Sequence, residues 1–596
     1  EKPTENPTDD PTEPPKKDVV YQLDPAADPE PEQQATKPAL STPEEPEATA
    51  PEATQANAPA AAPTTPTAPA ADPPAEGSAE NLTKNVIRVI NNWVGDAAKE
   101  LKIRLSNVNI KAENAGRKAA MDVSGGGKTK VELDGQNVLD SYSVLYQAGL
   151  RKQGEGTLTI TDETNDTGKK ITTPKSESDT SGSLTAKGAG GNGAAGIGGN
   201  VAEGTKNIII EGYATVHAAG GGSGAGIGGG GIYGDTQSGD AENIIIQGYA
   251  TVDAESGGGG AGIGGGYAGN AKNIIIRGHS KVTATAIGGA AIGGGHGSKS
   301  GGSAKGIVIR DHATVVAKNT GSGAAIGAAS GGNGEVTIGT DGATAEKEDV
   351  HVTATGCGGA AIGNGGKDTK VTIQGHATIR TASTVNFVAI GSENGNVEVT
   401  IKDNAAIDTE DTAFVGNSPT SSSAIGGVTM YSSADRTVKV TIDGGENGKV
   451  EIGKNSVLSG LYGAISGTEV KIGNNVLLKM KGRSSSGSRY ITENMYNNEA
   501  AVGTRSNPTA GGLVNTIGDN TELWYTDYYG VLQKIVHSKN LCKKELVGET
   551  AATCTTPGSK TYKCTFESFE SNNSAVDPEH TEQWTENTAI DPNAHD

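Results

Sequence analysis

The 24 residues from Asn207 to Gly230, NIIIEGYATVHAAGGGSGAGIGGG, contain the pattern that decides the fold. They divide into an aliphatic burst (NIII), an alternating piece (YATVHA) and a glycine-rich phrase with one isoleucine (GAGIGGG). The same three pieces recur from Asn243 to Gly266, and looser copies follow further along the chain. A motif of this regularity indicates a repeat architecture.

The isoleucine of the glycine-rich phrase gives the period of the repeat. Successive copies are separated by 30, 36, 29, 34, 36, 28, 35 and 40 residues, so a constant unit carries insertions of variable length. The nine copies are Ile197, Ile227, Ile263, Ile292, Ile326, Ile362, Ile390, Ile425 and Ile465.

Three short strands and three turns in each unit make one coil of a right-handed parallel β-helix, and the sequence therefore predicts an all-β solenoid. Stacked coils place like residues about 4.8 Å apart and bury a ladder that no single unit could bury alone. Alternation within the third piece predicts an inward column. Its members are Val216, Val252, Val282, Val315, Ile379 and Ile407.

A ligand-binding role for the glycine-rich phrase fits less well than a structural one. A dinucleotide-binding loop needs a helix after the glycines, and a phosphate loop needs Lys with Ser or Thr, yet neither accompanies these copies. A calcium-bound roll would place Asp in its turns, and GAGIGGG has none. We therefore expect no nucleotide and no cofactor in the repeat, and the only cofactor considered below is a structural zinc in the C-terminal module.

Composition divides the rest of the chain. Residues 1–80 hold 18 of the 24 prolines and 17 acidic residues against 4 lysines, which predicts a disordered acidic spacer, with a proline-rich docking ligand as the alternative. We assign 81–490 to the β-helix with an N-terminal cap that includes a short helix near Asp96 to Leu101. We expect an irregular connector or cap at 491–535 and a small Cys-containing β module at 536–596.

Charge and hydropathy exclude several partners. The net charge of −21 disfavours nucleic acid, which needs a concentrated basic face. The sequence contains no run of about 20 apolar residues, so we expect no transmembrane segment in it. Because the sequence starts at Glu1, we expect a processed chain or a piece of a longer protein, with any cell-wall attachment outside the given sequence.

Several phrases between Leu101 and Lys481 carry a family resemblance. The series LKIRLSNVNIKA, KTKVELDGQNVL, GTLTITDE and GSLTAKGAGGNGAAGIGGN, followed by the repeat, resembles glycine-rich β-helix modules of surface proteins from Gram-positive gut bacteria. The resemblance implies an extracellular, surface-bound or secreted adhesin-like module that binds carbohydrate. Its partner would be a glycan or a host or matrix ligand.

One outward column is a candidate ligand-binding site. The turn before the alternating piece carries Tyr213, Tyr249, His279, His312 and, after one interruption, His376. We expect these rings to stack along one edge of the solenoid, where aromatic groups can bind sugars. The alternative interpretation is that the rings stack only to stabilise the turn.

A glycan lyase or glycoside hydrolase on the same scaffold is the competing function. Such an enzyme needs clustered carboxylates on one face. Asp253 and Asp408 share an outward column, but Thr283, Val316, Thr353 and Arg380 stand between them, so this column builds no carboxylate pair. We therefore expect no catalytic residues and a protein that binds rather than cleaves.

The C-terminal cysteines leave two possibilities open. Cys542, Cys554 and Cys564 with His580 supply four side chains of the type that bind structural zinc, although the spacing is not the CxxC pattern. The alternative is one disulfide and one unpaired thiol. Cys357 aligns with small residues of other coils and is expected to be buried.

Overall fold

A computed structural model describes the chain in segments. These are residues 83–93, 99–113, 117–165, 168–173, 181–191, 193–231, 239–298, 300–364, 366–383, 388–392, 394–409, 424–427, 437–454, 458–460, 465–466, 469–482, 514–517, 520–526, 532–534, 544–564 and 583–590. The predicted spacer at 1–80 lies outside these segments.

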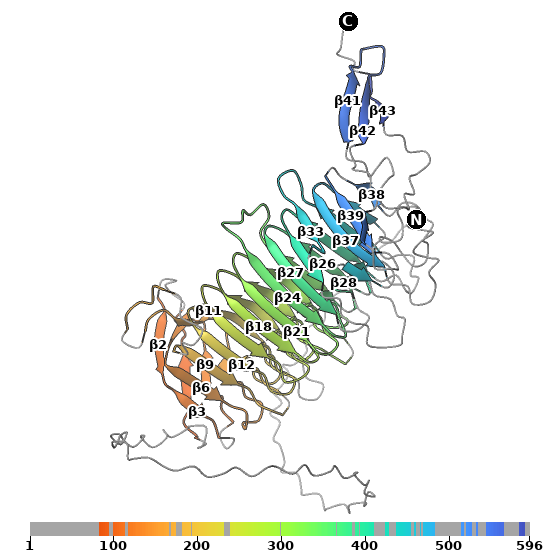
Figure 1. The fold of residues 1–596 in the computed structure, drawn as a ribbon. Helices are drawn as coiled ribbons and strands as arrows, with labels where there is room; N and C mark the ends of the chain where they lie inside the picture. Colours follow the sequence, from red (N-terminus) through yellow and green to blue (C-terminus); the bar gives the residue numbers. More distant parts are fainter. Residues whose placement is uncertain are drawn as a thin grey trace, which may run out of the picture. The chain divides into compact units, whose positions relative to one another are not determined.

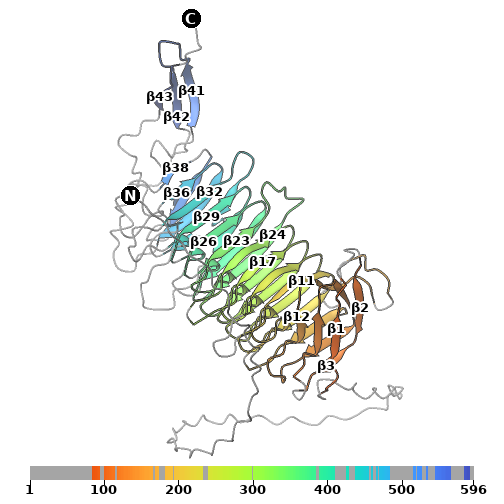
Figure 2. The ribbon, with the colours of Figure 1, turned by 180° about the vertical axis from the view of Figure 1, so that it is seen from behind.

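Three long sheets run side by side, and successive strands of the chain enter each sheet in turn, as Figures 1 and 2 show. Every pairing between neighbouring coils is parallel from β1 to β39, and the structure is therefore the predicted all-β parallel β-helix. Twelve coils contribute a strand to each sheet among the described residues.

The first sheet has 12 strands and carries the isoleucine–glycine pairs. It contains β1 (Ile87–Ile90), β4 (Met121–Ser124), β7 (Leu150–Lys152), β10 (Ile197–Gly198), β13 (Ile227–Gly228), β16 (Ile263–Gly264), β19 (Ile292–Gly293), β22 (Ile326–Gly327), β25 (Ile362–Asn364), β28 (Ile390–Ser392), β31 (Ile425–Gly427) and β35 (Ile465–Ser466).

The second sheet has 13 strands and carries the aliphatic bursts. It contains β2 (Leu101–Ser106), β5 (Thr129–Asp134), β8 (Leu158–Asp162), β11 (Thr205–Gly212), β14 (Ala241–Ile246), β17 (Ala271–Ile276), β20 (Ala304–Ile309), β23 (Gly334–Ile338), β26 (Thr369–Ile373), β29 (Val397–Lys402), β32 (Val438–Asp443), β36 (Glu469–Ile472) and β38 (Val514–Ile517).

The third sheet has 15 strands and carries the alternating pieces. It contains β3 (Asn109–Lys111), β6 (Gln136–Asp140), β9 (Ser183–Lys187), β12 (Thr215–Ala219), β15 (Thr251–Glu255), β18 (Lys281–Ala286), β21 (Thr314–Asn319), β24 (Val350–Gly356), β27 (Ala377–Ser383), β30 (Ala406–Thr409), β33 (Val450–Ile452), β34 (Leu458–Gly460), β37 (Val476–Gly482), β39 (Glu522–Thr526) and β40 (Leu532–Lys534).

The register of the first sheet confirms the predicted isoleucine period. The nine isoleucines form eight consecutive pairs, from Ile197 with Ile227 to Ile425 with Ile465. All nine side chains are fully buried. The predicted inward column of the third sheet, from Val216 to Ile407, is buried as well.

The glycine that follows each isoleucine from Ile197 to Ile390 is required by a close approach between coils. Gly228 has a φ of 143°, and a Cβ atom there would lie 1.8 Å from the carbonyl oxygen of Gly264. Gly264 repeats the arrangement against Gly293 in the next coil, at 2.0 Å. L-residues disfavour this backbone region and no side-chain atom fits the space, so only glycine suits the position.

The ends of the stack differ in two respects from the predicted elements. Lys99 and Glu100 are not helical and Leu101 opens β2, so the described part of the predicted helix is wrong; residues 94–98 lie outside the described segments. The strand preference of the alternating LKIRLS stretch prevails there. At the other end, β38 and β39 arise from the predicted connector at 491–535 and pair in parallel with β36 and β37.

The Cys-containing region forms a sheet of its own. It is antiparallel and contains β41 (Lys544–Thr550), β42 (Ser559–Cys564) and β43 (Gln583–Asn587).

Candidate functional site

Four of the five predicted rings form a continuous stack, which we call the aromatic column. Tyr213 and Tyr249 have centroids 5.1 Å apart, Tyr249 and His279 4.9 Å, and His279 and His312 4.6 Å. The planes differ by 11°, 9° and 3° in the same order. The rings occupy the turns between the second and third sheets in four consecutive coils, which confirms the predicted stacking for these residues.

His376 does not join the aromatic column. The coil between it and His312 carries the turn at 340–349, and no ring contact links the two histidines within the described residues. The Nε2 atom of His376 instead lies 3.3 Å from Nδ2 of Asn404, and its backbone N–H donates to Glu348 at 3.1 Å. A longer turn therefore replaces a ring and interrupts the column.

The stacking controls which parts of the rings can meet a ligand. Each inner ring has a neighbour on both faces, and Tyr249 nevertheless exposes 40% of its surface. The accessible part of an inner ring is therefore its edge, with the phenol hydroxyl or an imidazole nitrogen. Only Tyr213 and His312, at the two ends of the column, have a face without a ring neighbour in the described coils. The column thus offers a row of polar edges rather than a row of flat platforms.

An open depression of about 510 Å³, which we call the polar trough, lies against the same turns. It is lined by glycines, which we call its floor, and by charged or amide residues, which we call its walls. Its lining comprises Glu163, Glu211, Gly212, Gln247, Gly248, Arg277, Gly278, Arg310 and Asp311. Its glycines immediately precede three rings of the aromatic column, so the trough and the column are neighbours.

A chain of polar contacts runs along the trough. Nζ of Lys130 lies 3.7 Å from Oε1 of Glu211, whose Oε2 accepts a 2.6 Å hydrogen bond from Nε2 of Gln247. Oε1 of Gln247 in turn accepts from Nε and Nη2 of Arg277, at 2.8 and 2.6 Å. Gln247 is thus a neutral link between an anion and a cation, and both partners fix the orientation of its amide.

The acidic end of the trough is built from two carboxylates around one lysine. Lys130 also contacts Glu163, at 2.9 Å, so Glu163 and Glu211 share its ammonium group. Burial opposes the charge of Lys130, but Glu163 and then Glu211 outweigh it, and the pKa of Lys130 is raised above its ordinary value.

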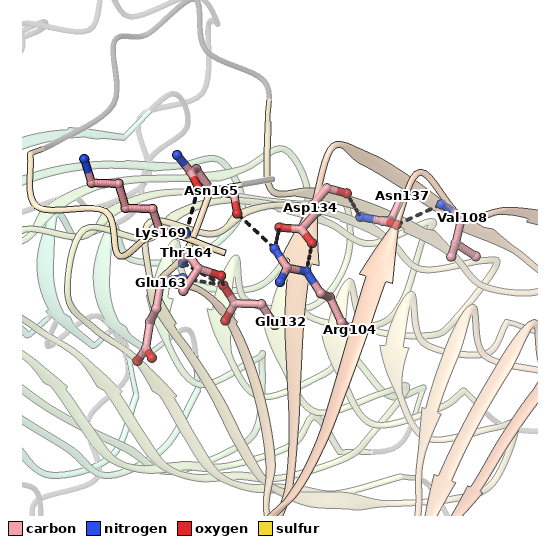
Figure 3. A network of polar contacts seen from close by, with 9 residues as sticks. All are labelled: Arg104, Val108, Glu132, Asp134, Asn137, Glu163, Thr164, Asn165 and Lys169. Atoms are coloured by element: carbon pink, nitrogen blue, oxygen red, sulfur yellow. Dashed lines mark hydrogen bonds and ion pairs between the residues drawn. The ribbon is translucent and has the colours of Figure 1, made fainter. Parts of the chain in front are cut away.

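The backbone from Glu163 to Asn165 is fixed beside this acidic end. Oε1 of Glu132 accepts hydrogen bonds from the backbone of Glu163 and Thr164, at 3.0 and 2.7 Å. Arg104 pairs with Asp134 and donates from Nη2 to the carbonyl oxygen of Asn165 at 2.9 Å, as Figure 3 shows. These contacts hold the backbone that carries Glu163 in one place.

The opposite end of the trough is basic. Arg277 and Arg310 occupy equivalent positions in consecutive coils, directly after paired strands β17 and β20. Nη1 of Arg310 lies 3.6 Å from Oδ1 of Asp311, and Oδ2 of Asp311 accepts from the backbone N–H of Gly278 at 3.2 Å. The lining of this end therefore contains two cations and one carboxylate, which pairs with Arg310.

Sequence reasoning found the aromatic column but missed the polar trough. The wall residues differ from coil to coil and so do not look like a repeat. Their common feature is a constant position two residues before each ring, which would have shown that these residues form a row of their own. The pairs are Glu211 with Tyr213, Gln247 with Tyr249, Arg277 with His279, and Arg310 with His312.

The column of Asp253 and Asp408 has the predicted register. Asp253 lies beside Thr283 in the next coil, and Asp408 pairs in register with Arg380. On its other side Asp253 contacts His217, with 3.4 Å between Oδ2 and Nδ1. In the trough, neighbouring coils bring Glu163 and Glu211 to the same ammonium group of Lys130.

The cysteine positions are described only in part. Cys554 is half-buried and has no disulfide, while Cys542, His580 and the side chain of Cys564 lie outside the described residues. No group of three metal-binding side chains occurs in the part of the chain that the structure describes. Zinc at these four residues stays a prediction. Cys357 is half-buried rather than buried, because its turn leaves one side open to solvent.

Comparison of the chain with protein-family models, with curated proteins and with solved structures gave no match. Among the described residues, no helix has the length and apolar character needed to cross a membrane.

Proposed function

We propose that this protein is a non-catalytic, adhesin-like module of a bacterial surface or of the secreted fraction, and that it binds glycans. The solenoid serves as a rigid support, and the ligand lies along the aromatic column and polar trough. The observation that carries the proposal is their adjacency over four consecutive coils. A strip of ring edges, arginines, an amide and carboxylates offers both donors and acceptors to the hydroxyl groups of a saccharide.

The floor of the trough supports an extended ligand. Gly248 and Gly278 lie between the wall residues and the rings and carry no side chain that would fill the space. Consecutive coils repeat this arrangement about every 4.8 Å. An oligosaccharide lying along the stack would therefore meet similar groups in each coil.

The second candidate is a glycan-cleaving enzyme, and the pair Glu163 and Glu211 favours it. Glycoside hydrolysis uses two carboxyl groups, one of which must hold a proton to act as the acid. Both carboxylates here contact the same ammonium group of Lys130, at 2.9 and 3.7 Å. Catalytic acids are usually kept neutral by apolar surroundings, so this pair is better suited to electrostatic positioning.

A glycan array followed by a turnover assay separates the two candidates. We expect saturable retention of the full chain on a subset of glycans and no product from the retained glycans after prolonged incubation. Sustained release of product would show that the protein cleaves glycans and would overturn the non-catalytic proposal. Failure to retain any glycan would remove the binding proposal. Labelling of intact cells by an antibody against the solenoid tests the surface location, and signal confined to lysed cells would contradict it.

A further inference from the structure

We propose that the basic end of the polar trough is a subsite for the carboxylate of an acidic saccharide, with Arg277 as its principal contact and Arg310 as its neighbour. This inference rests on the proposed function and names the class of glycan. Uronic acids are the simplest saccharides of this kind. The site uses residues that no repeated pattern in the sequence identifies.

Arg277 is oriented by the protein without being neutralised by it. Its Nε and Nη2 atoms both donate to the amide oxygen of Gln247, which carries no charge. No carboxylate lies within ion-pair distance of Arg277 in the described part of the chain. The hydrogen bonds fix the plane of the guanidinium group, while its Nη1 edge keeps its donors for a ligand.

Arg310 adds a second positive charge to the same end. Consecutive coils place the two arginines at equivalent positions, where like charges repel each other. Asp311 compensates one of them, since it contacts Arg310 at 3.6 Å and is itself held by the backbone of Gly278. One positive charge therefore remains, and a bound anion would relieve the repulsion.

A carboxylate matches this arrangement better than a neutral hydroxyl group does. Guanidinium and carboxylate groups are planar and form paired, charge-assisted hydrogen bonds. Gly248 and Gly278 line the trough beside Arg277 and carry no side chain that would obstruct the rest of a sugar ring. The acidic end of the trough, at Glu163 and Glu211, disfavours a second carboxylate there and so sets the direction of the ligand.

The experiment compares a galacturonic acid oligomer with its methyl-esterified, uncharged counterpart, using the full chain and calorimetry or thermophoresis. We expect the acid to bind more tightly than the ester. Arg277→Gln should weaken binding of the acid by about 10-fold to 100-fold, because it removes charge-assisted hydrogen bonds. Binding of the ester should change by less than about twofold.

Lys305→Gln is the matched control, since it removes one exposed positive charge from β20 outside the trough. It should leave both affinities unchanged. Thermal unfolding checks that each variant is folded, and Arg310→Gln serves as a second test if Arg277→Gln is unfolded. Arg277→Lys should restore only part of the affinity, because an ammonium group lacks the planar fork.

Several outcomes overturn the subsite. Equal affinity of the wild type for acid and ester, or equal losses in Arg277→Gln and Lys305→Gln, removes the specific role of Arg277. If a glutamate oligomer of the same charge binds equally well, with the same dependence on Arg277, the subsite is not specific for a saccharide. If the wild type binds neutral glycans but no acidic ones, only the subsite fails. If it binds no glycan at all, the proposed function fails with it.

Discussion

Oε1 of Gln247 accepts two hydrogen bonds from Arg277, at 2.8 and 2.6 Å, while Nε2 of the same amide donates to Glu211. This contact gives the arginine a fixed orientation and leaves its charge intact. A carboxylate at position 247 would supply a counterion at the same distance. The charge of a single side chain therefore determines whether the basic end of the trough attracts anions.

Gln247→Glu should accordingly weaken binding of an acidic saccharide about as much as Arg277→Gln does, although the arginine is still present. The new carboxylate pairs with Arg277 and repels both Glu211 and the ligand. Gln374→Glu is the matched control, because Gln374 occupies the equivalent place before His376, beyond the interrupted column. Unchanged affinity in Gln247→Glu would show that the charge of Arg277 is not used.

Tyr249 should contribute to stability through its two stacking partners. Tyr249→Ala removes contacts with Tyr213 and His279 and should lower the free energy of unfolding by about 1–3 kcal/mol. Tyr249→Phe keeps the ring and should be nearly neutral in thermal unfolding, while any hydrogen bond from the hydroxyl to a glycan is lost. Equal melting temperatures of the wild type and Tyr249→Ala would contradict a stabilising stack.

Gly228→Ala should be among the most damaging single substitutions in the repeat. The new methyl group would lie 1.8 Å from the carbonyl oxygen of Gly264, at a φ of 143°, so adjacent coils would have to separate. We expect a loss above about 3 kcal/mol or an insoluble protein. Gly191→Ala is the control, because nothing lies within 4 Å of a Cβ there. Similar solubility and melting of both variants would argue against the close approach.

An asparagine ladder in the second sheet gives a test of backbone strain. Asn243 donates to Asn207 at 3.0 Å and accepts from Asn273 at 2.7 Å, and it has a φ of 57°. Gly306 takes the same place one coil beyond Asn273, with a φ of 71°. Asn243→Gly should lose only the hydrogen bonds, whereas Asn243→Ala adds about 1–2 kcal/mol of strain. A higher free energy of unfolding for Asn243→Ala than for Asn243→Gly in chemical denaturation would contradict this.

Lys152 is a buried amine in the first sheet and should make stability depend on pH. Its side chain is 2% exposed, and Nζ donates to the carbonyl oxygens of Gln153 and Gly154 at 3.4 and 2.9 Å. Burial lowers its pKa from 10.5 to about 8. Between pH 8 and pH 10.5 the unfolded chain therefore keeps the proton of Lys152, whereas the folded chain has released it. The contribution of this lysine to the free energy of unfolding consequently rises with pH over that range.

Lys152→Met removes the cost of burying the charge and should be more stable than the wild type at pH 7, by at most about 3 kcal/mol. The advantage of Lys152→Met should shrink as the pH is raised from 8 towards 10.5, because the lysine then becomes neutral in the unfolded chain as well as in the folded chain. Urea denaturation of both proteins at pH 7 and pH 10 measures the difference, in which other titrating groups cancel. An advantage that grows with pH would contradict the lowered pKa.

The repeating features of the fold could be predicted because each recurs in chemistry as well as in spacing. The pair Ile227 and Gly228 reappears in each following coil up to Ile425 and Gly426, and Tyr249 and His279 both carry a flat ring. The trough could not be predicted in this way, because Glu211, Gln247 and Arg277 share only a position. Their side chains meet across coils rather than along the chain, so their contacts depend on the register.

The interruption of the aromatic column before His376 was equally hard to predict. His376 has the sequence context of a column residue, and only the longer turn at 340–349 separates it from His312. The length of one turn in the neighbouring coil decides the outcome. The N-terminal strand β2 shows the same limit, since its alternation could be recognised but the residues before it were expected to be helical.

Ile227 pairs with Ile263 across 36 residues and Ile263 pairs with Ile292 across 29, so the length of chain in a coil and the rise between coils are independent of each other. Residues added to a turn extend the chain but leave the rise between coils at about 4.8 Å. The distance between two surface groups along the solenoid is therefore counted in coils, as on a ruler with equal divisions. Duplication or loss of a whole coil would move a ligand-binding group by one division, whereas growth of a loop would not move it at all.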